Sequence, residues 1–247
     1  AVLERTFGDW NPRGRGADLD KTLPEPAFAR RGEGLQVFVV DRPGSPQTVI
    51  RVLQRAEPVD SEFWVEDHLI NGVLGGSFTS RLNANLREEK GWTYGAGSYL
   101  LQLSGDGALM AGTSVAADVT GPALMEILNE LLMLTTHEIS PMEATKAGAT
   151  YVQEAVEAHS TVASQAFDLA ERGWAGLPPE ILDQRLAHAA ELDAIALSER
   201  AQQMVTPGQL LVVLVGDGET IRAQLTGPDS PEVIEIDTDG NLLTGPS

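Results

Sequence analysis

The stretch from Leu74 to Tyr99 is Leu74-Gly-Gly-Ser-Phe-Thr-Ser-Arg-Leu-Asn-Ala-Asn-Leu-Arg-Glu-Glu-Lys-Gly-Trp-Thr-Tyr-Gly-Ala-Gly-Ser-Tyr99. Residues 80–90 place Leu82 and Leu86 four positions apart, which is the spacing of one helix face, whereas residues 93–103 have the composition of a β-strand. Gly91 separates the two segments, and glycine is the residue that most often ends a helix. The stretch therefore predicts a short helix that folds back into a strand.

Arg87 and Tyr94 lie on either side of Gly91 and are the two candidates for chemistry in this stretch. Arginine offers permanently charged donors and tyrosine a phenolic donor, so the two can hold a peptide carbonyl or a developing oxyanion. Arg87 also has Glu88 and Glu89 beside it, and a surface ion pair of about 0–1 kcal/mol would explain it equally well. Tyr94 could likewise be a half-buried aromatic residue of the strand. The residues alone leave both interpretations open.

The composition narrows the class of protein. A chain of 247 residues with 42% hydrophobic content can bury one good core, which favours a single domain. Seventeen basic against 36 acidic residues give a net charge of −19 without a Lys/Arg cluster, which disfavours nucleic acid and anionic membrane surfaces as partners. The charge favours basic peptides by long-range attraction, although solubility explains it as well. The absence of cysteine excludes disulfides, thiolate metal sites and cysteine nucleophiles.

The sequence contains no membrane or export signal that we recognise. No apolar run approaches the roughly 18 residues of a membrane helix, and no basic segment precedes an apolar one as in a signal peptide. The chain begins at Ala1 rather than at methionine. We therefore expect a processed chain or a part of a longer polypeptide.

The periodicity of apolar residues predicts the remaining elements. Residues 8–34 are rich in glycine, proline and charge and predict a linker. A strand pair is expected around Pro43-Gly44, a hairpin around Gly105-Asp-Gly107, and a buried central strand near the end of the chain. In chain order the predicted elements are strands 35–40 and 48–53, a helix capped by Asp60 or Ser61 that runs to about Leu74, strands 98–103 and 108–116, a helix that Thr120 caps and Pro122 opens, helices from Ser140-Pro141 to about His159 and over 161–174, 178–189 and 198–205, and strands 210–215 and 232–236. This order predicts an α+β fold with helices packed on one face of a mostly antiparallel sheet.

The sequence lacks the common catalytic motifs. An inverted zinc motif needs two histidines four residues apart, but the positions four residues after His68, His137, His159 and His188 are occupied by Gly72, Pro141, Ala163 and Leu192. We therefore predict no metal site in this chain and expect each histidine to be an isolated surface or half-buried residue. No serine-hydrolase elbow and no phosphate-binding loop is present either.

The central stretch carries a resemblance to a known family. Gly75-Gly-x-Phe-x-Ser-Arg-Leu82, followed by Leu86-Arg-Glu-Glu-Lys-Gly-x-x-Tyr-Gly95, resembles the second half-domain of the pitrilysin, insulinase and mitochondrial-processing-peptidase family. These are zinc endopeptidases with an inverted His-x-x-Glu-His motif. The resemblance extends to three further segments and covers roughly residues 1–240. The three segments are Leu3–Trp10, which resembles the end of a preceding half-domain, residues 41–50 and Leu211–Asp217.

The resemblance implies a mitochondrial-processing-peptidase-like half-domain that lacks the zinc motif. It assigns residues 1–34 to the end of a preceding unit and a linker, 35–240 to the half-domain, and 241–247 to a tail. Zinc would be supplied by a catalytic half-domain, on the same polypeptide or on a partner subunit, and the substrate would be an unfolded peptide. A periplasmic or otherwise exported bacterial protein is the location that the resemblance suggests.

The resemblance also implies roles for individual residues. Arg87 and Tyr94 would hold the substrate carbonyl and its transition state in trans, opposite the zinc of the other half-domain. Gly75, Gly76, Ser77 and Trp92 would bind substrate, the glycines by allowing a tight turn and a close backbone approach. For Trp92, lining the substrate path and covering the sheet remain alternatives, and for Arg81 we expect an ion pair to the core. Two other functions stay open: a catalytically silent scaffold of the same family, and an acidic peptide-binding module.

Overall fold

A six-stranded sheet forms the centre of the protein in the computed structural model, which describes residues 5, 34–226 and 231–243. The strand order is β3-β4-β2-β5-β1-β6. β1 is parallel to both β5 and β6, and the other neighbouring strands are antiparallel. The strands are β1 (Gln36–Asp41), β2 (Gln47–Arg55), β3 (Ala96–Leu103), β4 (Asp106–Ala116), β5 (Leu211–Gly216) and β6 (Val233–Ile236). The linker expected at 8–34, the segment Leu3–Trp10 and the end of the tail lie almost wholly outside the described residues.

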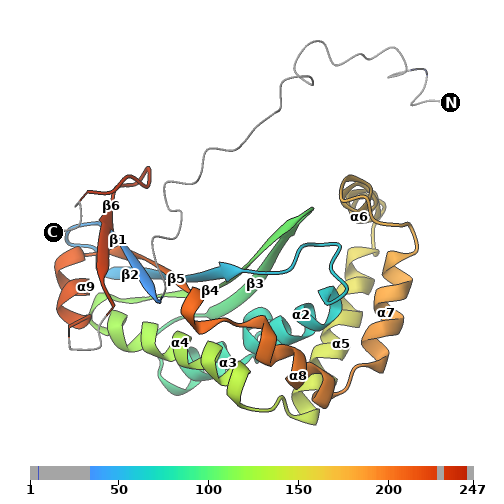
Figure 1. Cartoon of the computed structure of the whole chain (residues 1–247), viewed down its shortest axis with the longest axis horizontal. Coiled ribbons are helices and arrows are strands. Elements are labelled where there is room, and N and C mark those ends of the chain that lie inside the picture. Colours follow the sequence, from blue (N-terminus) through green and yellow to red (C-terminus); the bar gives the residue numbers. More distant parts are fainter. Residues whose placement is uncertain (1–4, 6–33, 227–230, 244–247) are drawn as a thin grey trace. The chain divides into compact units, whose positions relative to one another are not determined.

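Figure 1 shows the helices α2, α4 and α8 gathered on one face of the sheet. Among the described residues, no helix is long and apolar enough to cross a membrane. Two of the helices continue as π-helical turns, η1 (Gly72–Gly76) after α2 and η2 (Ala84–Glu89) after α3. The helices are α2 (Trp64–Asn71), α3 (Arg81–Asn83), α4 (Thr120–Thr136), α5 (Pro141–Ala158), α6 (Val162–Trp174), α7 (Ile181–Glu191), α8 (Ala194–Met204) and α9 (Gly218–Gln224).

The hydrophobic core lies between the sheet and this helical layer. Along β2 every second residue is buried, so Ile50 and Val52 face the core. The opposite wall comes from α4, where Leu124, Ile127 and Leu131 repeat at helical spacing and are almost completely buried. The predicted α+β class, with helices on one face of a mostly antiparallel sheet, is confirmed.

The expected pairing of the first two strands is wrong. β5 lies between β1 and β2, pairing in parallel with β1 and antiparallel with β2. Val212 is the register partner of Val37 on one side and of Val52 on the other. The run Leu211–Val215 has no polar residue, so it is most stable when strands on both sides satisfy its backbone. The turn at Pro43-Gly44 therefore joins two strands that a third one separates.

Several helix starts differ from the predicted caps. Neither Asp60 nor Ser61 caps α2, which begins at Trp64 after a turn in which the Ser61 hydroxyl accepts from the Phe63 amide at 3.1 Å. Thr120 is not a cap of α4 either, because its hydroxyl donates to the Ala117 carbonyl at 2.9 Å. A local side-chain bond competes here with the capping bond.

Two further helices also start at residues other than those predicted, whereas the predicted hairpin is present. The α8 helix starts four residues before the expected position 198, because the Asp193 carboxylate accepts from two amides of its first turn. α7 starts three residues later than expected, at Ile181. In the β3–β4 hairpin Gly105 has a φ of +79°, and β4 begins directly after it at Asp106.

Gly75 is required for the packing of η1 against β3. A Cβ atom at this position would lie 2.7 Å from the Gly97 carbonyl carbon and would overlap the Ser98 backbone amide. Backbone cannot move aside as a flexible side chain can, so we expect Gly75→Ala to lower the free energy of unfolding by about 1–3 kcal/mol. Gly148→Ala is the matched control, because no atom lies within 4 Å of its added Cβ, and alanine is favoured in the α5 helix by up to about 1 kcal/mol. Urea denaturation of both variants measures the difference, and equal stabilities would contradict this account of Gly75.

The expected ion pair of Arg81 is present and joins α3 to the start of α5. Its Nε donates to Glu143 Oε1 at 2.7 Å, and Glu143 also closes the capping box with Ser140. The Arg81 hydrogen bond lowers the pKa of Glu143 to about 2, against the effect of burial.

Glu143 therefore makes folding stability depend on pH in the acidic range. Because its folded pKa is depressed, its stabilisation is fully present above the ordinary glutamate pKa of about 4.3 and is lost as the pH falls toward 2. We expect Glu143→Gln to lower the free energy of unfolding by about 1–3 kcal/mol at pH 7, with a smaller deficit at pH 3. Denaturant titrations at the two pH values measure this, and a deficit independent of pH would contradict it.

Candidate functional site

The segment that carries the candidate residues is a helix, a glycine turn and a strand, as the sequence predicts. The helical part is α3 followed by the π-helical turn η2, which ends at Glu89. Gly91 has a φ of +65° and reverses the chain toward β3. π-Helical turns are rare and are frequently found at functional sites. Arg87 lies within η2, and Tyr94 lies in the loop between Gly91 and β3.

The Arg87 guanidinium stacks on an aromatic ring. Its Cζ lies 4.3 Å from the centroid of Phe78, and its nearest carboxylate oxygen is Glu88 Oε1 at 3.6 Å. Within the described part of the chain, no acceptor lies within hydrogen-bond distance of its nitrogens. The stacking holds the planar group while its donors remain available to a ligand. Phe78 belongs to the central motif but was not predicted to have a role, because cation–π contacts follow no fixed sequence spacing.

Tyr94 lies in a loop rather than in the strand. β3 begins at Ala96, three residues later than the predicted start at Thr93, and the Tyr94 side chain is 96% exposed. The Thr93 hydroxyl accepts from the Gly95 amide at 3.1 Å and so closes a local turn in place of strand pairing. The interpretation of Tyr94 as a half-buried strand aromatic is therefore wrong.

Buried polar side chains anchor both ends of this segment. Asn83 accepts from the Ala96 amide at 2.9 Å and donates to the Phe78 carbonyl at 3.0 Å, so it links α3, the Phe78 loop and the start of β3. On the other side, the Thr113 hydroxyl of β4 donates to the Gly95 carbonyl at 2.9 Å. The exposed side chains of Phe78 and Tyr94 thus belong to loops that these hydrogen bonds hold in place, and Arg87 is half-buried beside Phe78.

The other predicted site residues lie in different surroundings. Gly75 is buried against β3, whereas Gly76 and Ser77 line a cavity of about 210 Å³ between α2, α3 and α5. Tyr94 lines a different, open cavity of about 420 Å³, together with residues of β2, β3 and β4. Trp92 is partly buried against the hydrophobic core, with the Lys90 ammonium 5.6 Å from its ring centroid. The structure therefore does not bring the six predicted residues into one cavity.

The histidines do not form a metal centre in the described part of the chain. No group of three or more histidine, aspartate or glutamate side chains converges there as metal ligands would. His188 Nε2 lies 2.8 Å from Glu66 Oε1, His159 Nε2 lies 3.1 Å from Asp168 Oδ2, and His68 stacks on Trp64. His137 Nδ1 in turn lies 3.0 Å from the Thr136 hydroxyl, so each of the four imidazoles has a local partner, and no set of described residues fits zinc.

Comparison with known proteins identifies the class that this fold defines. Residues 1–150 match the family described as the peptidase M16 inactive domain. This match covers more than half of the 247 residues. The chain belongs to the M16 peptidase family, as an inactive domain. No curated protein matches the sequence.

Solved structures share the fold at low sequence identity. The M16 inactive domain from Pseudomonas fluorescens matches with a TM-score of 0.66 and 20% identity over 75% of this chain and 45% of that one. The inactive peptidase domain of a protein described as a zinc protease, from Bordetella parapertussis, gives 0.62 and 14% over 71% and 92%. The periplasmic protease PqqL from Escherichia coli gives 0.61 and 12% over 76% and 21%.

This chain spans less than half the length of the Pseudomonas fluorescens protein. By contrast, it covers nearly all of the Bordetella parapertussis domain, which is itself an inactive domain. The matched fold is thus a part of the Pseudomonas fluorescens chain and nearly the whole of the Bordetella parapertussis one.

Proposed function

We propose that this domain completes the active site of a zinc endopeptidase whose metal and general base belong to another half-domain. Arg87 and Tyr94 would bind the carbonyl oxygen of the peptide bond that is cleaved. The observation that carries this proposal is Tyr94, a tyrosine with a 96% exposed side chain on a loop that buried hydrogen bonds hold in place. Because hydrogen bonds fix the loop, the exposed phenol is held in place to donate to a ligand.

Both groups suit an oxygen on which negative charge develops. The Tyr94 phenol can donate one hydrogen bond, and the Arg87 guanidinium offers several charged donors while Phe78 holds its plane. Charge-assisted hydrogen bonds strengthen as the oxygen becomes negative, so they stabilise the transition state more than the bound substrate. No other step of the reaction is assigned to this chain.

Two observations support the assignment of zinc to a second half-domain. Zinc would have to bind elsewhere, because the histidines described above are paired locally and no ligand cluster exists among the described residues. The family match and the Bordetella parapertussis domain are both described as inactive domains, which supports the same division of labour. The other half could be on the same polypeptide or on a partner subunit.

Metal analysis and a cleavage assay of the purified 247-residue chain test this division. After dialysis against zinc and then against buffer, we expect far less than one zinc per chain and no cleavage of an unfolded peptide. One tightly bound zinc per chain, or cleavage by the chain alone, would contradict the proposal. If the chain proves silent even in the complete assembly, the scaffold function would be favoured instead.

We also propose an exported location for the assembled enzyme. The support is the fold shared with PqqL, which is described as a periplasmic protease. Fractionation of the native host, followed by immunoblotting for this chain, would show it outside the cytoplasm. Recovery in the cytoplasmic fraction alone would contradict this location.

A further inference from the structure

A further cavity, which neither Arg87 nor Tyr94 lines, lies between α2, α5, α6, α7 and the tip of the β3–β4 hairpin. Its volume is about 390 Å³, within the range of small-ligand pockets. Trp64, His68 and Tyr151 form an aromatic wall on one side, with ring centroids 4.7–6.2 Å apart. Apolar side chains also line other parts of the cavity, among them Leu101, Leu103, Leu177, Ile181 and Leu182.

Arg185 of α7 supplies a cation at this cavity. Its guanidinium lies 3.6 Å above the Trp64 ring, and its Nη2 donates to the Val59 carbonyl at 2.6 Å. Among the described residues no carboxylate forms an ion pair with it, and the titratable groups that act on it are Tyr151 and Arg172, although the chain carries 36 acidic residues against 17 basic ones. Burial lowers the pKa of Arg185 to about 10, so the group stays charged at neutral pH. A half-buried charge without a counter-ion is costly, which makes a bound anion favourable here.

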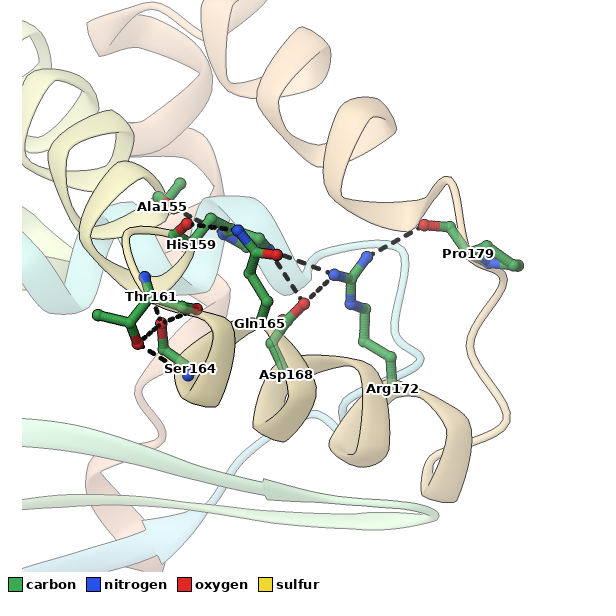
Figure 2. Close-up of polar contacts among 8 residues, drawn as sticks. All are labelled: Ala155, His159, Thr161, Ser164, Gln165, Asp168, Arg172 and Pro179. Atoms are coloured by element: carbon green, nitrogen blue, oxygen red, sulfur yellow. Dashed lines mark hydrogen bonds and ion pairs between the residues drawn. The ribbon is translucent and has the colours of Figure 1, made fainter. Parts of the chain in front are cut away.

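The other charges at the cavity are already engaged or face water. Figure 2 shows Asp168 between His159 and Arg172, and Arg172 also donates to the Pro179 carbonyl at 3.0 Å. The carboxylate of Glu154 lies 3.8 Å from His68 Nε2, and Glu171 is exposed. These carboxylates disfavour a ligand with several negative charges but leave Arg185 free for one carboxylate.

The rim of the cavity indicates a ligand larger than a small acid. Trp174, Leu101 and Leu103 line the cavity but remain 78%, 52% and 43% exposed, so apolar surface continues outward from it. This surface would be covered by a chain-like ligand. Its last unit would carry both the negative charge and an apolar group, and the units before it would lie on the exposed rim. Guanidinium matches carboxylate geometry through two parallel hydrogen bonds.

We propose that this cavity binds the C-terminal end of a peptide whose last residue is large and apolar. The terminal carboxylate pairs with Arg185, the last side chain packs on the aromatic wall, and the preceding residues cover the exposed rim. This site is separate from Arg87 and Tyr94, and it stands or falls independently of the proposed peptidase role.

Calorimetric titration of the intact 247-residue chain tests the site with two peptides. Acetyl-Ala-Ala-Phe with a free carboxylate is expected to bind at least about tenfold more tightly than the same peptide ending in an amide, since a charge-assisted hydrogen bond exceeds 1.4 kcal/mol. Equal affinities for the acid and the amide would overturn the proposal. This comparison uses the unaltered protein, so it does not depend on how a variant folds.

Two variants test whether Arg185 causes the preference for the free carboxylate over the amide. Arg185→Met keeps an apolar stem over Trp64 and is expected to bind acid and amide alike, whereas Arg55→Met makes the same change of net charge at an exposed arginine outside the cavity and retains the preference. Retention of the preference in a folded Arg185→Met chain would overturn the assignment. If 3-phenylpropionate binds as tightly as the peptide acid, the occupant is a small acid and the peptide assignment is wrong.

Discussion

Replacing Tyr94 by phenylalanine is expected to lower the kcat of the zinc-containing assembly by about 10²–10³-fold, the usual cost of losing one oxyanion donor. The change removes only a hydroxyl that is exposed in this domain, so the denaturation midpoint should stay the same. KM should change little, because the lost hydrogen bond is made mainly in the transition state. Steady-state cleavage of an unfolded peptide, with zinc content measured in parallel, provides the test.

Tyr99→Phe is the matched control for this substitution. Tyr99 lies on β3, lines the same open cavity and is 52% exposed, but its hydroxyl contacts the sulfur of Met110. Loss of that hydroxyl should leave kcat within about twofold of the unaltered assembly, because the proposal gives it no substrate contact. If Tyr94→Phe is no slower than Tyr99→Phe, the role of Tyr94 in transition-state stabilisation is refuted.

Replacing Arg200 by leucine is expected to lower the free energy of unfolding by about 3–5 kcal/mol, the largest effect on stability that we predict. Arg200 donates twice to the Asp67 carboxylate, at 2.7 and 2.9 Å, and Asp67 is only 1% exposed. Its loss leaves a buried carboxylate without its cation and removes the contact with the Phe63 ring. The pair links α2 to α8, so the helical layer behind the candidate site depends on it.

The pH dependence of this deficit identifies its cause. Burial already raises the pKa of Asp67, although Arg200 opposes the shift. Without Arg200 the pKa rises further, so Asp67 takes up a proton more readily as the pH falls, and the neutral form costs less to bury. The deficit should therefore be smaller at pH 5 than at pH 8.

Arg55→Leu serves as the control for the loss of an arginine. Arg55 pairs with Asp106 at 3.0 Å, but both side chains are largely exposed, and such pairs contribute about 0–1 kcal/mol. Urea titrations of the two variants at both pH values make the comparison. Similar losses in the two variants, or a deficit for Arg200→Leu that does not change with pH, would contradict this account.

The sequence predicted elements well where the signal was local. The apolar spacing of α4, the helix start at Ser140-Pro141 and the glycine stop at Gly91 each depend on residues close in the chain, and each is present. The insertion of β5 between β1 and β2 depends on residues more than 150 positions away, so it could not be seen in a local pattern.

The candidate site shows the same limit. The motif indicated Arg87 and Tyr94 as candidates, but the exposure of Tyr94 arises from a turn that Thr93 closes in competition with strand pairing. The contact between Arg87 and Phe78 and the pairing of Arg185 with Trp64 depend on how helices pack. Such contacts follow from tertiary packing, and no spacing of residues in the sequence predicts them.

We propose that this domain supplies half of an active site to a zinc-binding half-domain. Titration of that half-domain, produced separately, with this chain tests the claim most directly, with peptide cleavage as the readout. The account predicts that the zinc-binding half alone is nearly inactive and that activity rises to a plateau at one chain per zinc site. A zinc-binding half that cleaves the peptide equally fast with and without this chain would contradict the account.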